Sequence, residues 1–437
     1  MKGIQRVFDV YYVPRYFWLT SAIVALFVFS CKKKNNDETY PTIQIVMPLE
    51  GRIYYFGDDI SIEASIQDEK QLESIEVAIT DRQGNKFLEQ QTYSPTERTF
   101  DVSLIIRHND LYLTGGTYYV RIRASDGENE QFAFREIQLV EAPRQIENLF
   151  IVRYTGGSCS VDSLSGSYFQ PYFQFAHEYF GGGINARTNQ LVICSSQPGD
   201  LQTFLYPEFE PINALFPPSN DVITAFHHDQ QNRCFYWGTM SGAIWKTDLQ
   251  GTRLFSSTNA GRITSIGSGL QRVVVSSENV NQQFVSAIRA DNGLVETTLT
   301  IDWHIKGILH LASESNRILL LGNQSNMSRF AWLNLSTSAI NEVYNLYENS
   351  PVISVCDGAG NDFYVVHSTG IARYNNTMNS YSVSNFQQAE KLVYDEIGNS
   401  LWAVSEQTLT QLDAMGETVI QSFQVAGLKD FWIKYNK

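Results

Sequence analysis

Hydrophobic and polar residues alternate at every second position in six runs between residues 41 and 141. Turn-forming pairs, such as Gly57 with Asp58 and Gly115 with Gly116, separate these runs. The two-residue period is that of half-buried strands, and about a hundred residues without a helical period predict an antiparallel β-sandwich. The runs are TIQIVMP, DISIEASI, LESIEVAITD, TFDVSLII, TYYVRIRASD and FAFREIQLV.

A repeat of roughly 40 residues follows a short connector around Pro143. Each repeat opens with an amide residue and four or five strand-forming residues, and a second turn lies further along it. This spacing predicts four strands per repeat, which is the layout of a propeller blade. The repeats open with NQLVICSS, NRCFYWGT, QRVVVSSE, NRILLLGN, NDFYVVHS and NSLWAVSE, at residues 189, 232, 271, 316, 361 and 399.

Strands from both ends of the repeat region are expected to complete one more blade. The C-terminal run KDFWIKY remains after six full repeats, as do the earlier runs NLFIVRYTGG, CSVDSLSG and PYFQFAHE. Joining them closes the ring and removes exposed strand edges. We therefore expect an all-β protein, with a sandwich at 41–142 and a seven-bladed β-propeller at 146–437; eight or six blades are the alternatives.

The first thirty residues have the parts of an export signal: a basic start ending at Arg15 and an apolar run from Phe17 to Ser30. As a helix this run rises roughly 21 Å, which is short of a hydrocarbon core of roughly 30 Å. We therefore expect a signal peptide at 1–30. An uncleaved membrane anchor is the alternative.

The tetrapeptide Val28, Phe29, Ser30, Cys31 resembles the lipobox of bacterial lipoproteins, although a smaller residue is usual at Phe29. The resemblance implies that Cys31 is lipidated and becomes the N-terminus. The following KKKNNDET resembles the tether of Bacteroidetes lipoproteins, which implies a tether at 31–40. We expect an outer-membrane lipoprotein of the cell envelope, facing the periplasm or the exterior, with the membrane as its first partner.

Both folded regions resemble bacterial modules. The sandwich is similar to immunoglobulin-like and PKD-like modules in PTIQIVMPLEG, GDDISIEASIQDEKQLESIEVAI and GTYYVRIRASDGENE. The stretches GNDFYVVHSTGIARYNN and GNSLWAVSEQTLTQLD resemble ligand-sensor and YVTN-type propeller repeats. The tryptophan–aspartate dipeptide of WD40 blades is absent, and so are the aspartate boxes of sialidases.

Composition narrows the possible partners. The chain is 43% hydrophobic, 18% charged and carries a net charge of -14, which describes a folded acidic protein that repels nucleic acid. Four cysteines beyond Cys31 are widely spaced and lack a CxxC pattern, so they predict buried free thiols rather than a zinc or redox site, with a disulfide as the alternative. They are Cys159, Cys194, Cys234 and Cys356.

The loops between blades carry aromatic, acidic and imidazole side chains. Such rings and carboxylates suit a carbohydrate or an extended peptide, although the rings also suit the seams between blades. The candidate ligand-binding residues are Tyr179, Phe180, Asp221, Trp303, His304, Tyr347, Glu348 and Phe386.

Metal, cofactor and nucleophile motifs are not found. His227 and His228 are adjacent, and adjacent strand residues point to opposite faces, so a structural role is expected for both. No GxSxG, HExxH or phosphate-binding glycine loop occurs. We expect no metal, no cofactor and no catalytic residue.

These observations predict a lipid-anchored binding protein, with the sandwich as spacer and the propeller as platform for a glycan or another envelope protein. The alternative is a polysaccharide hydrolase or lyase with carboxylates at the channel mouth. An enzyme should bring two or three titratable groups together at that mouth, as paired carboxylates require. A third possibility is a scaffold within an outer-membrane complex.

Overall fold

The structure is a computed structural model that describes residues 39–175, 177–195, 199–215, 221–229, 232–259, 261–345, 350–377, 380–384, 386 and 389–437. The chain divides into two compact units, one ending at Pro143 and the other beginning at Arg144. Across the described residues every regular element is a β-strand, so the all-β expectation is confirmed.

The first unit consists of two sheets. A three-stranded sheet has the order β1-β3-β6, and a five-stranded sheet has the order β2-β8-β7-β4-β5. The strands are β1 (Thr42–Met47), β2 (Arg52–Tyr54), β3 (Asp59–Gln67), β4 (Ser74–Thr80), β5 (Lys86–Tyr93), β6 (Thr99–Arg107), β7 (Gly116–Ser125) and β8 (Glu130–Leu139).

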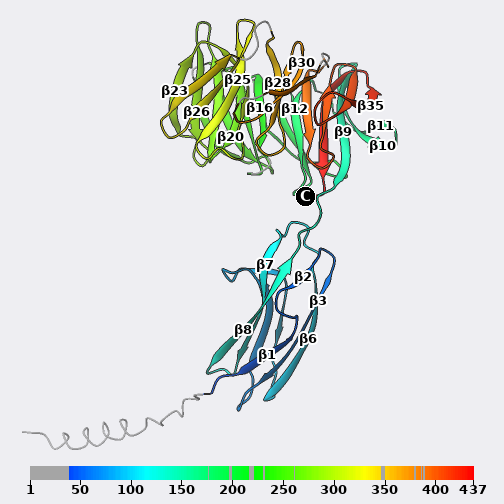
Figure 1. Ribbon diagram of the computed structural model, residues 1–437, viewed down its shortest axis with the longest axis vertical. Coiled ribbons are helices and arrows are strands. Elements are labelled where there is room, and N and C mark those ends of the chain that lie inside the picture. The colour runs from blue at the N-terminus through cyan, green and yellow to red at the C-terminus, as the bar shows by residue number, and fades with distance from the viewer. Residues whose placement is uncertain are drawn as a thin grey trace, which may run out of the picture. The chain divides into compact units, whose positions relative to one another are not determined.

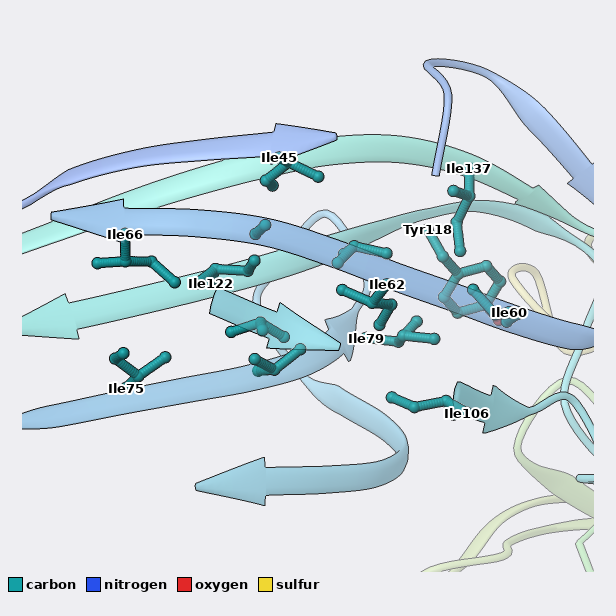
Figure 2. Packing of buried hydrophobic residues seen from close by; sticks show 14 of the residues in the cluster. Ile45, Ile60, Ile62, Ile66, Ile75, Ile79, Ile106, Tyr118, Ile122 and Ile137 are labelled. Atoms are coloured by element: carbon teal, nitrogen blue, oxygen red, sulfur yellow. The ribbon is translucent and has the colours of Figure 1, made fainter. Parts of the chain in front are cut away.

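Branched aliphatic side chains from both sheets form one core. Figure 2 shows Ile62 of β3 beside Ile79 of β4, and Ile66 of β3 beside Ile122 of β7. These residues occupy alternate positions of their strands, so the sequence pattern places them all on the inner faces. Complete burial of each such side chain contributes roughly 1.5–3 kcal/mol.

Two features of this unit differ from the sequence prediction. Strands β2 and β5 fall outside the six predicted runs. In addition, β2 pairs with β8 in parallel, through Ile53 and Gln138 among others, so the arrangement is not wholly antiparallel. Both strands are at sheet edges, where half of the backbone groups need no partner strand and a short or polar segment suffices.

The second unit contains seven four-stranded antiparallel sheets within its described residues. Sheet 1 joins β11 (Tyr168–Phe175), β10 (Ser158–Ser165), β9 (Ile146–Thr155) and β36 (Leu428–Tyr435). Sheet 2 comprises β12 (Tyr179–Asn185), β13 (Gln190–Ser195), β14 (Leu201–Leu205) and β15 (Glu210–Leu215). Sheet 3 comprises β16 (Ile223–Asp229), β17 (Cys234–Thr239), β18 (Ala243–Asp248) and β19 (Arg253–Thr258).

The remaining sheets repeat this order. Sheet 4 comprises β20 (Arg262–Gly269), β21 (Arg272–Glu278), β22 (Gln283–Arg289) and β23 (Val295–Ile301). Sheet 5 comprises β24 (His304–Leu309), β25 (Arg317–Gln324), β26 (Met327–Asn334) and β27 (Ala339–Asn345). Sheet 6 comprises β28 (Val352–Asp357), β29 (Phe363–His367), β30 (Gly370–Tyr374) and β31 (Ser380–Ser384), and sheet 7 comprises β32 (Lys391–Asp395), β33 (Ser400–Val404), β34 (Thr408–Asp413) and β35 (Val419–Gln424).

One edge strand of each sheet contacts its counterparts in the two neighbouring sheets. Following β12, β16, β20, β24, β28, β32 and β36 returns to β12, so these inner strands form a closed ring and the unit is a β-propeller (Figure 1). The C-terminal β36 pairs antiparallel with β9, with Phe431 opposite Ile151. Segments from both ends of the unit therefore share sheet 1.

Large side chains fill the seams between sheets. Phe330 and Trp332 of sheet 5 pack with Phe363 and Tyr374 of sheet 6, and the ring centroids of Phe330 and Tyr374 lie 5.1 Å apart. Since each sheet has two apolar faces, neighbours on both sides are needed to keep them from water.

Candidate functional site

The inner strands all begin on one rim of the ring. Each of the seven follows the outermost strand of the preceding sheet, so their N-terminal ends share one side of the propeller. We call this side the entrance rim. Sequence analysis expected ligands at this position.

A β-bulge interrupts six of the seven inner strands close to the start of the strand. In these six strands the pairing with the adjacent strand of the same sheet shifts by one residue, so that one residue of the inner strand has no opposite residue. In sheet 7 the Glu390 N–H donates to the Val404 carbonyl, and Lys391 pairs with the same Val404. Bulges redirect side chains and are frequent at binding sites. We call the residues at this position bulge residues, counting Glu390 of the seventh sheet with them although β32 has no shift of register; they are Phe180, Thr224, Thr264, Lys306, Ile353, Glu390 and Lys429.

Five bulge residues offer exposed side chains. Phe180 and Ile353 are apolar, Lys306 and Lys429 are cationic, and Glu390 is anionic. The rim therefore combines apolar contact area with charges of both signs, as binding sites for mixed polar and apolar ligands do.

The two bulge threonines are used within the protein instead. The Thr224 hydroxyl donates to the Ile263 carbonyl of the next sheet at 2.7 Å, and the Thr264 hydroxyl donates to Ser276 Oγ at 3.1 Å. On this arc of the rim the bulges therefore stabilise the ring rather than present free groups.

The residue after the bulge is small in five strands because the next sheet packs closely against it. A Cβ atom at Gly307 would lie 2.0 Å from Val355 Cγ2, and one at Gly181 would lie 3.3 Å from the Phe226 ring. The small residues are Gly181, Ala225, Ser265, Gly307 and Ser354.

Lys391 and Asp430 occupy this position in the other two strands, and they bind each other. Lys391 Nζ donates to Asp430 Oδ1, and the Tyr179 hydroxyl donates to Asp430 Oδ2. Asp430 is only 3% exposed. The three side chains come from sheets 7, 1 and 2, so one carboxylate links three neighbouring sheets where the ring closes. Burial and the Asp430 charge hold the pKa of Tyr179 far above its usual value, which keeps the phenol protonated as a donor.

Three of the eight candidate residues from the sequence lie in the seams between sheets. Tyr179 binds Asp430 and packs on Trp432, Trp303 is buried between sheets 4 and 5, and Phe386 packs against the core of sheets 6 and 7. Asp221 accepts hydrogen bonds from Ser241 within its own sheet. Burial alone would raise the pKa of Asp221, but these hydrogen bonds lower it.

Phe180 and His304 are the exposed members of that set. His304 Nδ1 lies 3.5 Å from Glu278 Oε2 of the preceding sheet. The sequence analysis placed Tyr179, Phe180 and His304 in loops. In the structure Tyr179 and Phe180 belong to β12, and His304 belongs to β24. Tyr347 and Glu348 lie outside the described residues. The contacts described above for Tyr179, Asp221 and His304 are all with residues that the sequence analysis did not select as candidates.

His227 and His228 point to opposite faces of β16, as predicted. His227 Nε2 lies 2.9 Å from Ser268 Oγ of sheet 4, whereas His228 lies against Gly183 of sheet 2. Burial lowers the pKa of His227, and burial together with His227 lowers that of His228 to about 3. The described residues contain no group of three metal-ligating side chains.

The four cysteines are free thiols, as expected, and three are buried. Burial raises the pKa of Cys159 and Cys234 to about 11 and that of Cys356 to about 12. Burial also raises the pKa of Cys194 well above its usual value. Thiols with such values stay protonated at neutral pH and are poor nucleophiles.

Sequence analysis missed most bulge residues, although a signal for them exists. Five inner strands read large apolar, any residue, small residue, as in Ile223-Thr224-Ala225 and Ile305-Lys306-Gly307. The middle position of this triplet is the bulge. The two strands without the small residue are those that carry Lys391 and Asp430.

Comparison with known proteins gives a limited result. Residues 29–128 match a family described as "Domain of unknown function (DUF4625)". No curated protein matches this chain. A solved structure with a similar fold is the β-propeller domain of Cps50 (Swd1) from Myceliophteria thermophila, with 10% sequence identity, a TM-score of 0.46, and coverage of 57% of this chain and 87% of that chain. Among the described residues there is no helix of the length and apolarity that a membrane crossing requires.

Proposed function

We propose that this protein is a lipid-anchored binding protein of the cell envelope that uses the entrance rim of its propeller to hold a glycan or another envelope protein. The observation that carries the binding role is the set of bulges at equivalent positions of six of the seven inner strands, with Glu390 at the same position in the seventh sheet. These positions place Phe180, Lys306, Ile353, Glu390 and Lys429 on one rim with exposed side chains. Repetition of a bulge around a ring gives a single surface built from separate sheets.

The anchor is proposed from the sequence. An apolar run ends at Cys31, and a lysine-rich polar segment follows it. Each buried methylene contributes roughly 0.8 kcal/mol, so several acyl chains on one cysteine hold a protein firmly at a membrane. Placement in the outer membrane, and similarity to Bacteroidetes lipoproteins, belong to the same proposal.

We also propose that each of the seven sheets is one blade, which makes the propeller seven-bladed and of the YVTN or ligand-sensor kind. The two sheets of the first unit share one core, which supports an immunoglobulin-like or PKD-like sandwich.

Capture from solubilised membranes tests the binding role. The full chain with an affinity tag is compared with the variants Phe180→Ala and Ile353→Ala, and bound proteins are identified by mass spectrometry while bound sugars are read on a glycan array. Ile397→Ala is the matched control, because Ile397 is equally exposed but lies in the turn after β32, away from the entrance rim. Loss of one reproducible ligand in the rim variants alone supports the proposal. An unchanged set of ligands in both rim variants rules out this surface.

A polysaccharide hydrolase or lyase is the second candidate, favoured by the convergence of Tyr179, Lys391 and Asp430. This group holds one carboxylate rather than a pair, and its tyrosine stays protonated, so it offers a proton donor without a matched base. Assays of polysaccharide cleavage by the wild type and by Tyr179→Phe decide the question. Cleavage that disappears in the variant establishes an enzyme.

A further inference from the structure

A hollow lies in the first unit, on the outer face of its five-stranded sheet. Its volume is about 480 Å³, within the roughly 300–1,000 Å³ of small-molecule sites. Residues of the turn after β4 and of strands β7 and β8 line it; they are Asp81, Arg82, Gln83, Gly84, Tyr119, Arg121, Phe132 and Phe134.

Two phenylalanines form the apolar part of this hollow. Phe132 and Phe134 are 42% and 57% exposed, their ring centroids lie 6.5 Å apart, and their planes are parallel within 14°. They face away from the core, since Ile137 and Leu139 carry the core side of the same strand. Leaving two large rings in water forgoes roughly 1.5–3 kcal/mol each, and neighbouring exposed rings bordered by polar groups mark a ligand surface.

The charges beside the rings are already balanced. Arg121, opposite Phe134 in the β7–β8 pairing, binds Glu76 through Nη2, and Lys86 Nζ lies 3.1 Å from the same carboxylate. Burial would raise the pKa of Glu76, but hydrogen bonds from Lys86 and Arg121 lower it, so the carboxylate stays ionised. Arg121 and Lys86 therefore serve an internal network, which leaves Arg82 as the exposed cation that lines the hollow.

The turn supplies hydrogen-bonding groups. Asp81 Oδ1 accepts from the Asn85 backbone N–H at 2.9 Å and Oδ2 accepts from Asn85 Nδ2 at 2.8 Å, which fixes the turn beside the rings. Arg82 and Gln83 at the tip of the turn are exposed and line the hollow. Parallel ring faces beside amide and guanidinium groups match a ligand that has an apolar face and hydroxyls at its edge.

We propose that this hollow is a second binding site, for pyranose rings of a neutral polysaccharide, independent of the propeller rim. The C–H face of a pyranose packs on Phe132 and Phe134, and its hydroxyls bind Gln83 and Arg82. The first unit then holds a glycan directly and is more than a spacer.

Isothermal titration of the full chain in detergent with cellohexaose, xylohexaose and mannohexaose tests this site. At least one hexasaccharide should bind saturably, and the double variant Phe132→Ala/Phe134→Ala should bind it about tenfold more weakly or not at all. Tyr55→Ala removes a similarly exposed ring of the first unit, outside the hollow, and should bind as the wild type does. Should the double variant fail to fold, Gln83→Ala at the turn tip provides the same comparison.

Three results would overturn the proposal: no saturable binding of any of the three sugars, equal affinity of the wild type and the variants of the hollow, or tighter binding of hexagalacturonate than of every neutral sugar. If a polyproline peptide displaces the bound sugar at a concentration lower than that of the sugar, the hollow formed by Phe132 and Phe134 is a peptide-binding site instead.

Discussion

Lys391 Nζ donates a hydrogen bond to Asp430 Oδ1, which joins the inner strand of sheet 7 to the C-terminal strand of sheet 1. Both residues replace a small residue that five other inner strands carry at the same place. The seam between sheet 7 and the C-terminal strand is thus held by an ion pair in addition to side-chain packing.

Replacing Asp430 should destabilise the propeller more than replacing Lys391. Asp430→Ala leaves the buried Tyr179 hydroxyl without its acceptor, at a cost of about 1–3 kcal/mol in the free energy of unfolding. The Lys391 side chain is 44% exposed, so Lys391→Met should cost less because water screens the lost pair. Denaturant titrations should show that the double variant loses less than the sum of the two single losses. Simple additivity would mean that the pair is not coupled.

Gly307→Ala should destabilise the propeller by about 1–3 kcal/mol, because the new methyl group would lie 2.0 Å from Val355 Cγ2. Gly181→Ala is the matched control at the equivalent position of sheet 2. Its new methyl group would lie 3.3 Å from the movable Phe226 ring, and the cost should be smaller. Thermal unfolding should also show that Val355→Ala restores part of the stability lost by Gly307→Ala. No rescue would contradict the seam contact.

Acid should destabilise the wild type more than His228→Phe. The folded-state pKa of His228 is about 3, below its unfolded value near 6.5, so the folded protein keeps the ring neutral while the unfolded chain takes up a proton. The stability is therefore complete above pH 6.5 and is lost as the pH falls from 6.5 towards 3, by about 1.4 kcal/mol per pH unit. The difference in unfolding free energy between wild type and variant, measured from pH 7 to 4.5, should shrink at that rate. A difference independent of pH would exclude a buried neutral His228.

Cys31→Ser should release the protein from the membrane fraction and abolish incorporation of a labelled fatty acid, since the serine hydroxyl cannot form the thioether to diacylglycerol. Cys356→Ser should leave fractionation and labelling unchanged, because burial keeps the Cys356 thiol protonated. Fatty-acid labelling of both the Cys31→Ser and the Cys356→Ser variant, or of neither variant, would contradict attachment at Cys31.

The sequence pattern predicts strands well where both faces of a sheet are buried. The run FYVVH is β29 (Phe363–His367), and every residue in it is buried. Strand β5 was not predicted because its sequence, KFLEQQTY, is an edge strand with only half-buried and exposed residues. Strand β2 is three residues long, too short to display a period.

The site was harder to predict than the strands. A bulge shifts the pairing by a single residue, and the triplet Ile305-Lys306-Gly307 can be recognised as a bulge only after β24 is aligned with β25. The contact between Lys391 and Asp430 depends on which strands become neighbours when the ring closes. Exposed rings such as Phe134 resemble core residues in sequence, and their position on the outer face follows only from the register of β8.

The pairing of β36 with β9 makes the last strand of the propeller necessary for closure of the ring. Without β36, β9 keeps an open row of amide and carbonyl groups, and sheets 2 and 7 each lack a neighbour. A chain that lacks β36 therefore exposes unpaired strand edges, which can pair with other chains and promote aggregation before the ring can close.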